Sequence, residues 1–167
     1  QSGCNETLKR MNRKYTAEEY YEVCERLRKH YDNPALTTDV IVGFAGETEE
    51  EFAECKAFLE KVEFFETHVF KFSIRKGTRA AKMENQVPDQ VKTKRSNELI
   101  ALNTKNSTKY LQGHLGKKLE VLMEEQMEFE GETYFIGHTK EYIRVAVKTE
   151  ENLTNRFVTV TAKEILK

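Results

Sequence analysis

Apolar residues recur at helical spacing in two separate stretches near the start of the chain. The first stretch consists of Tyr20, Val23, Cys24, Leu27 and Tyr31. Thr16 with Glu19 forms a capping box ahead of it, so the pattern predicts a helix over about 17–30. A second capping box, Thr48 with Glu51, leads into another apolar stripe and predicts a helix over about 49–61.

Two further stretches have the patterns of strands. The run VIVGF at 40–44 has apolar side chains on both faces, as in a central parallel strand that is covered on both sides. Phe70, Phe72 and Ile74 alternate with polar residues, which predicts a half-buried strand. A long linking helix is expected from Pro88 to Gly113. Its loosely periodic positions are Val91, Arg95, Leu99, Leu102, Asn106 and Tyr110.

The pattern changes to strands alone after residue 113. Four short segments, KKLEVLME, ETYFIGH, EYIRVAVK and RFVTVTAKEI, are separated by turns that contain Glu, Gly and Asn. Short antiparallel strands of this kind favour a small barrel, because closure removes the free sheet edges. The sequence therefore predicts an α/β fold in two parts. A partial β/α barrel with its linking helix covers 1–112, and a small all-β antiparallel barrel of the OB-like kind covers 113–167.

Composition and length narrow the class of protein. With 167 residues the chain is too short for a complete eight-stranded β/α barrel, which needs about 250. Its 27 basic and 28 acidic side chains give a net charge of −1, so RNA binding would depend on a local basic patch. No apolar run approaches the roughly 20 residues that span a bilayer, and no signal segment opens the chain. We therefore expect a cytoplasmic protein without a membrane partner.

The three cysteines, Cys4, Cys24 and Cys55, lie far apart in the sequence. Metal sites and iron–sulfur clusters are usually held by closely spaced cysteines, and none of these three has a close neighbour of its kind. Free thiols in a reducing compartment are expected, and no metal ligand is assigned.

The parallel strands of the first part are too few for a complete sheet. Two strands with crossover helices leave two free edges, and the amides of VIVGF need neighbours. The chain also begins with Gln-Ser-Gly rather than Met. We therefore expect residues 1–112 to be the later part of a larger barrel. The open sheet edge would pair with the preceding portion of the same polypeptide or with a second copy of the chain.

Four segments resemble, in this order, the later half of the radical S-adenosylmethionine methylthiotransferases. They are QSGCNETLKRMNRKYTAEEY, TTDVIVGFAGETEEEF, VFKFSIRKGTRAAKM and QVPDQVKTKRSNEL. The tail from GKKLEVLMEE to FVTVTAKEIL resembles the TRAM domain, the RNA-binding module that ends these enzymes. Four segments in fixed order are more specific than any one of them, and the resemblance covers nearly the whole chain.

The resemblance implies a part of a tRNA-modifying enzyme. HVFKFSIRKGT and QSGCN are most similar to the branch that adds a methylthio group at C2 of N6-threonylcarbamoyladenosine, next to the anticodon. The branch that modifies isopentenyladenosine is the close alternative, and the branch that modifies a ribosomal-protein aspartate fits the VFKFS strand less well. These enzymes use S-adenosylmethionine and two [4Fe-4S] clusters, whose cysteines lie in segments that this sequence does not contain. Cys4 occupies a position where the family often has Ser, so this chain alone is expected to bind no cluster and to catalyse nothing.

The resemblance also implies residues that hold S-adenosylmethionine. Gln1 and Ser2 would lie beside its ribose and methionine parts, at the carboxyl end of a barrel strand. The alternative is a plain strand-to-helix turn at Gly3. Arg13 would pair with the carboxylate of the cofactor, since a guanidinium matches a carboxylate with two hydrogen bonds, unless it is only a solvated charge.

The motif VGFAGE would approach the adenine through its backbone, at Val42, Gly43 and Phe44. Family members generally have Pro where this chain has Ala45, and the loss of a fixed φ loosens the turn. Glu47 is expected to brace the following helix rather than to act as an acid.

Basic residues after the second strand are candidates for binding the anticodon stem-loop of tRNA. Arg75, Lys76, Arg79 and Lys82 lie within eight residues, in a loop that would contact phosphates. An ordinary solvated loop is the alternative.

The tail is less basic than a typical RNA-binding module. Its segment 113–167 has eight Lys and Arg against ten Glu, a net charge of −2, so binding would come from one face. The candidates on that face are Lys117, Lys118, Arg144 and Lys148, with Tyr134, Phe135 or Tyr142 for base stacking. Aromatic residues that alternate in such strands are more often core, and His68, His114 and His138 are expected to be structural.

Two other functions remain open from the sequence. The chain would be a non-catalytic RNA-binding piece if the TRAM-like tail alone carries the function. It would be a metabolic β/α enzyme if the tail serves oligomerisation, and it would then bind no tRNA.

Overall fold

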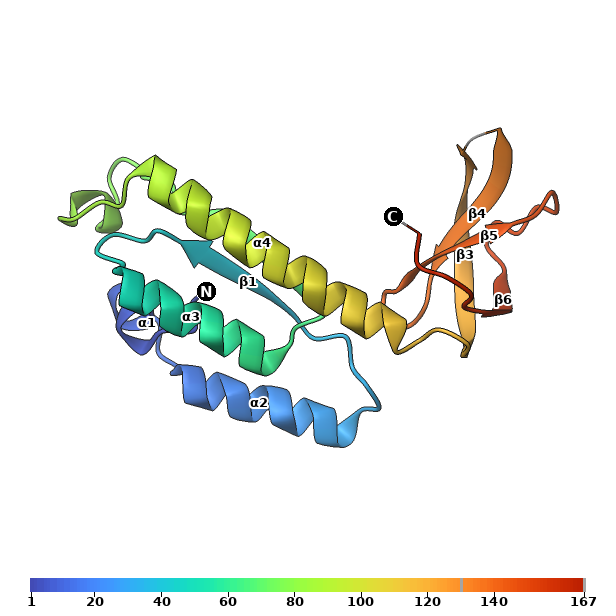
Figure 1. The fold of residues 1–167 in the computed structure, drawn as a ribbon, viewed down its shortest axis with the longest axis horizontal. Coiled ribbons are helices and arrows are strands. Elements are labelled where there is room, and N and C mark those ends of the chain that lie inside the picture. The colour runs from blue at the N-terminus through green and yellow to red at the C-terminus, as the bar shows by residue number, and fades with distance from the viewer. Residues whose placement is uncertain (130, 167) are drawn as a thin grey trace. The chain divides into compact units, whose positions relative to one another are not determined.

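The computed structural model describes residues 1–129 and 131–166, and the chain divides into two compact units, Gln1–Ser107 and Thr108–Lys167 (Figure 1). The dividing point falls inside the longest helix, α4, which spans Asp89–Gln112. The other elements of the first unit are α1 (Asn5–Arg10), α2 (Ala17–His30), β1 (Thr37–Val42), α3 (Glu49–Val62), β2 (Glu66–Lys71) and the 3-10 turn η1 (Ala80–Lys82). No helix in the described part of the chain is long and apolar enough to cross a membrane.

Both capping boxes are confirmed at the starts of α2 and α3. The Glu19 amide donates to Thr16 Oγ1 at 3.1 Å, and the Thr16 amide donates to the Glu19 carboxylate at 2.8 Å. Thr48 and Glu51 repeat this exchange at 3.2 and 3.0 Å. These reciprocal bonds satisfy amides that a helix start leaves without partners, so both predicted helices begin where the sequence placed them. The short helix α1 was not predicted.

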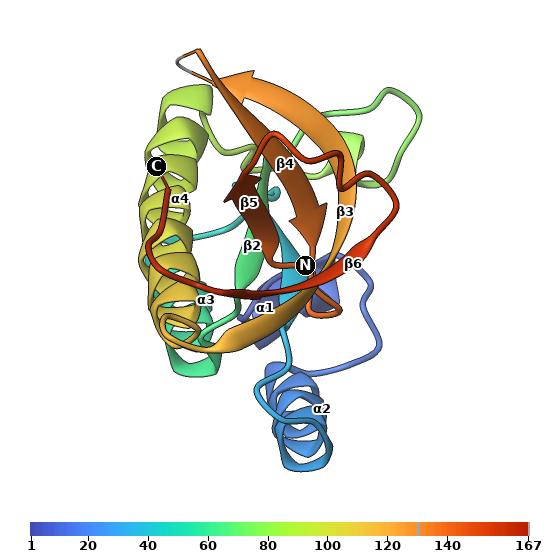
Figure 2. The same cartoon turned by 90° about the vertical axis from the view of Figure 1, so that its right-hand side faces the viewer.

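The two strands of the first unit are parallel, and α3 connects them. Their register runs from Thr37 opposite Glu66 to Val42 opposite Lys71. Figure 2 shows α3 and α4 on the same side of this sheet. The core lies on that side and contains Cys4, Cys24, Val40, Val42, Phe52, Cys55, Leu59, Val62, Phe64 and Leu99.

Helix α4 is fixed to β2 and to the residue before it by two polar contacts. The Thr67 amide donates to Asn103 Oδ1 at 2.7 Å, and Ser107 Oγ donates to the Phe65 carbonyl at 2.6 Å. The C-terminal half of the helix is therefore held by directional bonds as well as by apolar packing.

The opposite face of the parallel sheet is largely open, which corrects two sequence expectations. In β1, Val40 and Val42 are buried but Ile41 is only partly buried, so the run is not covered on both sides. In β2 the alternation is real, yet the side chains turned to the core are Thr67 and Val69. The predicted half-buried residue Phe70 is 53% exposed, because the described chain supplies no layer for that face. The strand ends at Lys71, so Phe72 and Ile74 lie beyond it, and Ile74 is also 53% exposed.

The second unit is an antiparallel sheet of four strands in the order β5-β4-β3-β6 (Figure 2). The strands are β3 (Lys118–Phe129), β4 (Glu132–His138), β5 (Arg144–Lys148) and β6 (Phe157–Thr161). Its core is formed around Leu119, Val121, Met123, Phe135 and Leu153.

The predicted closed barrel is wrong: β5 and β6 remain the two edges of an open sheet among the described residues. Four strands were foreseen correctly, but neighbouring strands differ in direction by only about 20–25°, and a barrel with a filled interior generally needs more of them. The sheet curves around its core without meeting itself.

Candidate cofactor and RNA-binding site

The turn after β1 has a backbone that only glycine adopts readily. Gly43 has φ +69° and Gly46 has φ +78°, and the Glu47 amide closes the turn on the Phe44 carbonyl at 2.9 Å. Phe44 is buried and its ring meets Phe72 edge-to-face, with centroids 4.8 Å apart. The turn therefore has one defined shape, at the carboxyl end of a parallel strand, where ligands of such sheets bind.

The three residues proposed to approach the adenine are all buried. Val42 is 1% and Phe44 7% exposed, so their side chains belong to the core. The Gly43 amide donates to the Glu47 carboxylate at 2.7 Å, and the Val42 carbonyl accepts from the Phe72 amide at 2.9 Å. Much of this backbone already has partners, and its contact with adenine stays a prediction.

Glu47 braces the turn. Its carboxylate is held by Gly43 and by Arg95 of α4, whose Nη1 lies 2.7 Å from Glu47 Oε2. Burial raises the pKa of Glu47 above its usual range, against the opposing effects of the Gly43 amide and of Arg95. The sequence predicted that Glu47 braces the following helix, whereas its carboxylate joins the turn to α4, and Arg95 was missed. The signal was present: a charged residue occupied a position in the apolar stripe of the predicted long helix.

A second ion pair fastens the start of α3 to α1. Arg10 donates to both oxygens of the Glu51 carboxylate, which also accepts from the Thr48 amide. The Arg10 guanidinium holds the pKa of Glu51 below its usual value. The capping box and this pair thus fix the same helix end, directly after the turn.

Gln1 and Arg13 lie together at an open pocket of about 690 Å³ in the first unit. Arg13 donates to Gln1 Oε1 at 3.0 Å, and the Gln1 carbonyl accepts from the Ile41 amide at 2.9 Å. Tyr20 and the strand segment 37–39 form other parts of the pocket wall. The structure therefore brings Gln1 and Arg13 to one site beside β1.

Ser2 is placed differently from its neighbours. It is 7% exposed, and its hydroxyl accepts from the Cys4 amide at 3.2 Å. It does not line the pocket that Gln1 and Arg13 share. A direct contact of Ser2 with a cofactor stays a prediction, whereas its role in the turn is observed.

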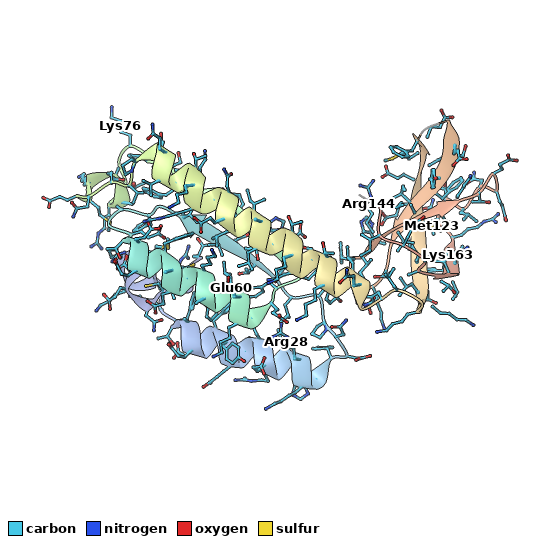
Figure 3. The ribbon with its side chains drawn as sticks, viewed as in Figure 1. Arg28, Glu60, Lys76, Met123, Arg144 and Lys163 are labelled. Carbon is cyan, nitrogen blue, oxygen red and sulfur yellow. The ribbon has the colours of Figure 1, made fainter. Side chains whose placement is uncertain are left out.

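The basic loop after β2 is open to solvent. Arg75, Lys76, Arg79 and Lys82 are all exposed, and Lys76 extends away from the ribbon in Figure 3. Thr78 Oγ1 donates to the Arg75 carbonyl at 2.8 Å and accepts from the Ala81 amide at 3.2 Å, which shapes the loop. Within residues 1–129 and 131–166 these four cations have no carboxylate at ion-pair distance, so they remain available to an anionic partner.

Two of the four cations proposed for the basic face of the second unit already have carboxylate partners. Arg144 lies 3.4 Å from a Glu125 carboxylate oxygen, and Lys148 pairs with Glu132. Lys117 and Lys118 are exposed and form no ion pair with the described residues. Arg144, labelled in Figure 3, therefore begins with a partner that an RNA phosphate would have to replace.

The aromatic candidates for stacking differ sharply in exposure. Phe135 is 2% exposed and lies in the core, and Tyr134 is partly buried. Tyr142 is 80% exposed, with its ring 6.0 Å from that of His138. Tyr142 is therefore the most exposed of the three.

His68, His114 and His138, three of the four histidines, do not gather at one site. His68 is exposed on β2, and His114 is buried with its Nδ1 2.9 Å from the Tyr110 carbonyl. His138 Nδ1 lies 2.7 Å from a Glu124 oxygen. Their separate positions are consistent with local structural roles.

The cysteines of this chain do not fit an iron–sulfur cluster. Cys4, Cys24 and Cys55 are buried free thiols, and burial raises the pKa of each, which opposes formation of a ligating thiolate. Cys55 Sγ accepts from the Gly3 amide at 3.1 Å. Among the described residues no three His, Cys, Asp or Glu side chains are close enough to hold a metal ion.

Comparisons with known proteins place the chain in a family. Residues 1–59 match the model of the radical SAM superfamily. The chain is 44% identical over 161 residues to the threonylcarbamoyladenosine tRNA methylthiotransferase of Bacillus subtilis (strain 168), covering 96% of this chain and 36% of the relative.

Two relatives are named tRNA-2-methylthio-N(6)-dimethylallyladenosine synthase. That of Clostridium botulinum (strain Hall) is 48% identical over 124 residues, which is 74% of this chain and 28% of the relative. That of Caldicellulosiruptor saccharolyticus is 41% identical over 160 residues, which is 96% of this chain and 34% of the relative. This chain thus belongs to the radical SAM methylthiotransferase family, and it spans about a third of the length of the curated relatives that it matches.

Proposed function

We propose that this chain is part of an enzyme that adds a methylthio group at C2 of N6-threonylcarbamoyladenosine, next to the anticodon of tRNA. The observation that carries the proposal is the 44% identity to the threonylcarbamoyladenosine tRNA methylthiotransferase of Bacillus subtilis, over 96% of this chain. The pocket beside β1 and the exposed basic loop after β2 support the proposal, as the places where the cofactor and RNA would bind.

Gln1 and Arg13 would hold S-adenosylmethionine in this enzyme. Arg13 is exposed and uses one nitrogen for Gln1, so its guanidinium keeps further donors for a carboxylate. When bound, S-adenosylmethionine supplies the radical chemistry of the family. The share of this chain is to orient the cofactor at the end of the strands, through Arg13 and through the turn that Glu47 braces.

The two [4Fe-4S] clusters that the family implies would be held by polypeptide outside this chain. The described residues provide no ligand set for them, and we derive no step through a cluster here. This assignment agrees with the small share of each relative that the chain spans.

The free edge of β1 supports the same proposal. The bond between the Gln1 carbonyl and the Ile41 amide continues the hydrogen-bond pattern of a parallel sheet on the side of β1 away from β2. A strand that leads into Gln1 would lie along Thr37–Asp39 and would narrow the pocket to the end where Arg13 lies. A second copy of the chain could use the same edge, and light scattering of the purified chain would reveal it as a dimer.

The anticodon stem-loop would contact the loop with Arg75, Lys76 and Arg79. Each cation that neutralises a phosphate releases counterions, so binding should weaken steeply as salt rises. In the second unit, Lys117 and Lys118 have free charges, whereas Arg144 and Lys148 already have carboxylate partners. We therefore propose that the first pair contributes more to RNA affinity than the second.

A second candidate is the dimethylallyladenosine branch. The relative from Clostridium botulinum with that name is 48% identical, although over fewer residues than the Bacillus subtilis protein. Both candidates share the reaction and differ in the group on N6 of the adenosine.

Deletion of the gene, followed by mass spectrometry of tRNA nucleosides, separates the candidates. Loss of 2-methylthio-N6-threonylcarbamoyladenosine alone supports the proposal, and loss of the dimethylallyl nucleoside alone favours the second branch. Retention of both contradicts an enzyme of either branch and leaves the non-catalytic RNA-binding module or the metabolic enzyme.

Complementation of the deletion tests the assigned cofactor residue. The gene with Arg13→Ala should restore the modification poorly, because the carboxylate partner is lost. Lys14→Ala, which removes the neighbouring exposed charge, is the matched control and should restore it fully.

A further inference from the structure

A buried ion pair connects the turn after β1 with helix α4. The side chains of Arg95 and Glu47 are 4% and 1% exposed, and the two residues are 48 positions apart in the sequence. A buried ion pair is costly to desolvate and often stabilises a fold no better than apolar residues of the same size. The role of this ion pair therefore lies in the residues that it holds in place rather than in the stability that it adds.

Arg95 forms two hydrogen bonds with Glu47. Its Nη1 donates to the Glu47 carboxylate at 2.7 Å and to the Glu47 carbonyl at 3.1 Å. The same carboxylate oxygen accepts the Gly43 amide at 2.7 Å. One guanidinium nitrogen thus holds both ends of the turn. It binds the Glu47 carboxylate, which accepts the Gly43 amide, and it binds the backbone carbonyl of Glu47.

The guanidinium is itself held from the side of α3. Its carbon lies 5.2 Å from the centre of the Phe52 ring, and Nη2 donates to Glu49 at 3.0 Å. The Arg95 Nε has no hydrogen-bond partner among the described residues. A planar group with several fixed donors meets these conditions, whereas the single ammonium of lysine would not reach all of them.

We propose that Arg95 is a positioning residue, which fixes the shape of the turn from Gly43 to Glu47 and thereby the affinity of the site for S-adenosylmethionine. This rests on the proposed function, because the ligand of the turn is taken from it. Among the described residues, Arg95 contacts the turn through Glu47 alone, so it acts on binding and not on the chemical step.

The test uses the full-length protein, with S-adenosylhomocysteine as the probe. Equilibrium dialysis measures its dissociation constant, and hydrogen exchange with mass spectrometry follows the peptide that contains residues 43–47. Arg95→Met and Arg95→Lys should raise the dissociation constant about tenfold, since small displacements of a positioning group are costly, and should speed exchange in this peptide. The KM for S-adenosylmethionine should rise while kcat changes little.

Lys94→Met is the matched control. It removes the exposed cation next to Arg95 on α4 and leaves the contacts of Arg95 to Glu47 intact, so binding and exchange should stay close to the wild type. A folded Arg95→Met protein with wild-type affinity and wild-type exchange at 43–47 would overturn the proposal.

Glu47→Gln decides the question if the Arg95 variants do not fold. It keeps the volume of the side chain and removes the charge that attracts both Gly43 and Arg95, so exchange at 43–47 should rise. Unchanged protection there would refute the positioning role. A wild-type protein that fails to bind S-adenosylhomocysteine would contradict the proposed function instead, and the exchange measurements would still decide the role of Arg95 in the turn.

Discussion

Replacement of Gly43 by alanine is the sharpest test of the packing between the turn after β1 and helix α4. Gly43 has φ +69°, and a Cβ at this position would lie 2.3 Å from Cγ of Lys92. Lys92 is 5% exposed, so its stem has little room to move. Alanine would therefore meet both an unfavourable backbone conformation and a steric overlap.

Gly77 provides a control for the first of these effects. It has φ +89°, but no atom lies within 4 Å of the position of its Cβ. Gly77→Ala should cost only the left-handed backbone, about 1–2 kcal/mol of unfolding free energy. Gly43→Ala should cost that amount plus an overpacking cost of about 1–3 kcal/mol.

Urea denaturation followed by far-ultraviolet circular dichroism measures both variants, because the helices of the first unit dominate that signal. Lys92→Ala removes the atom that would clash, so the double variant Gly43→Ala with Lys92→Ala should be more stable than the sum of the single effects by about 1 kcal/mol or more. Equal destabilisation by the two glycine replacements, or strictly additive effects of Gly43→Ala and Lys92→Ala, would refute the reasoning.

Three other predictions concern the core, pH and RNA. Met123 is fully buried in the second unit (Figure 3), so Met123→Ala should lower the unfolding free energy of that unit by about 2–5 kcal/mol. Hydrogen exchange should rise in β3 to β6 but not in α3, and equal loosening of both units would contradict this. Arg10 holds the pKa of Glu51 below its usual value of 4.5. The ion pair therefore contributes fully to the unfolding free energy above pH 4.5, and this contribution is lost as pH falls through the lower pKa of the folded state. Arg10→Met should therefore destabilise the chain at neutral pH and lose this effect in acid, and urea titrations that give a constant difference at every pH would disprove the assignment. Lys76→Ala should reduce the salt slope of stem-loop binding by about 0.9, as expected for one lost phosphate contact, whereas Lys148→Ala, which removes a charge already paired with Glu132, should change it less; fluorescence anisotropy at several salt concentrations would detect the opposite order.

The sequence determined the local elements of this protein. The capping pairs Thr16 with Glu19 and Thr48 with Glu51 located two helix starts, because a capping box needs only residues three positions apart. The strands and the long helix were likewise predicted from the periodic spacing of apolar residues. The family also followed from the order of short motifs, and it agrees with the relatives found.

Only the tertiary structure decided which faces are buried and which charges meet. Phe70 and Thr67 lie in one alternating strand, and the position of α4 selects Thr67 for the core. Closure of the second sheet depends on whether β5 and β6 reach each other, which no local pattern encodes. The pair of Arg95 and Glu47 joins residues far apart in the chain, so its formation depends on how α4 packs against the turn. Such contacts arise from the packing of elements that are distant in the chain, so no local pattern in the sequence reveals them.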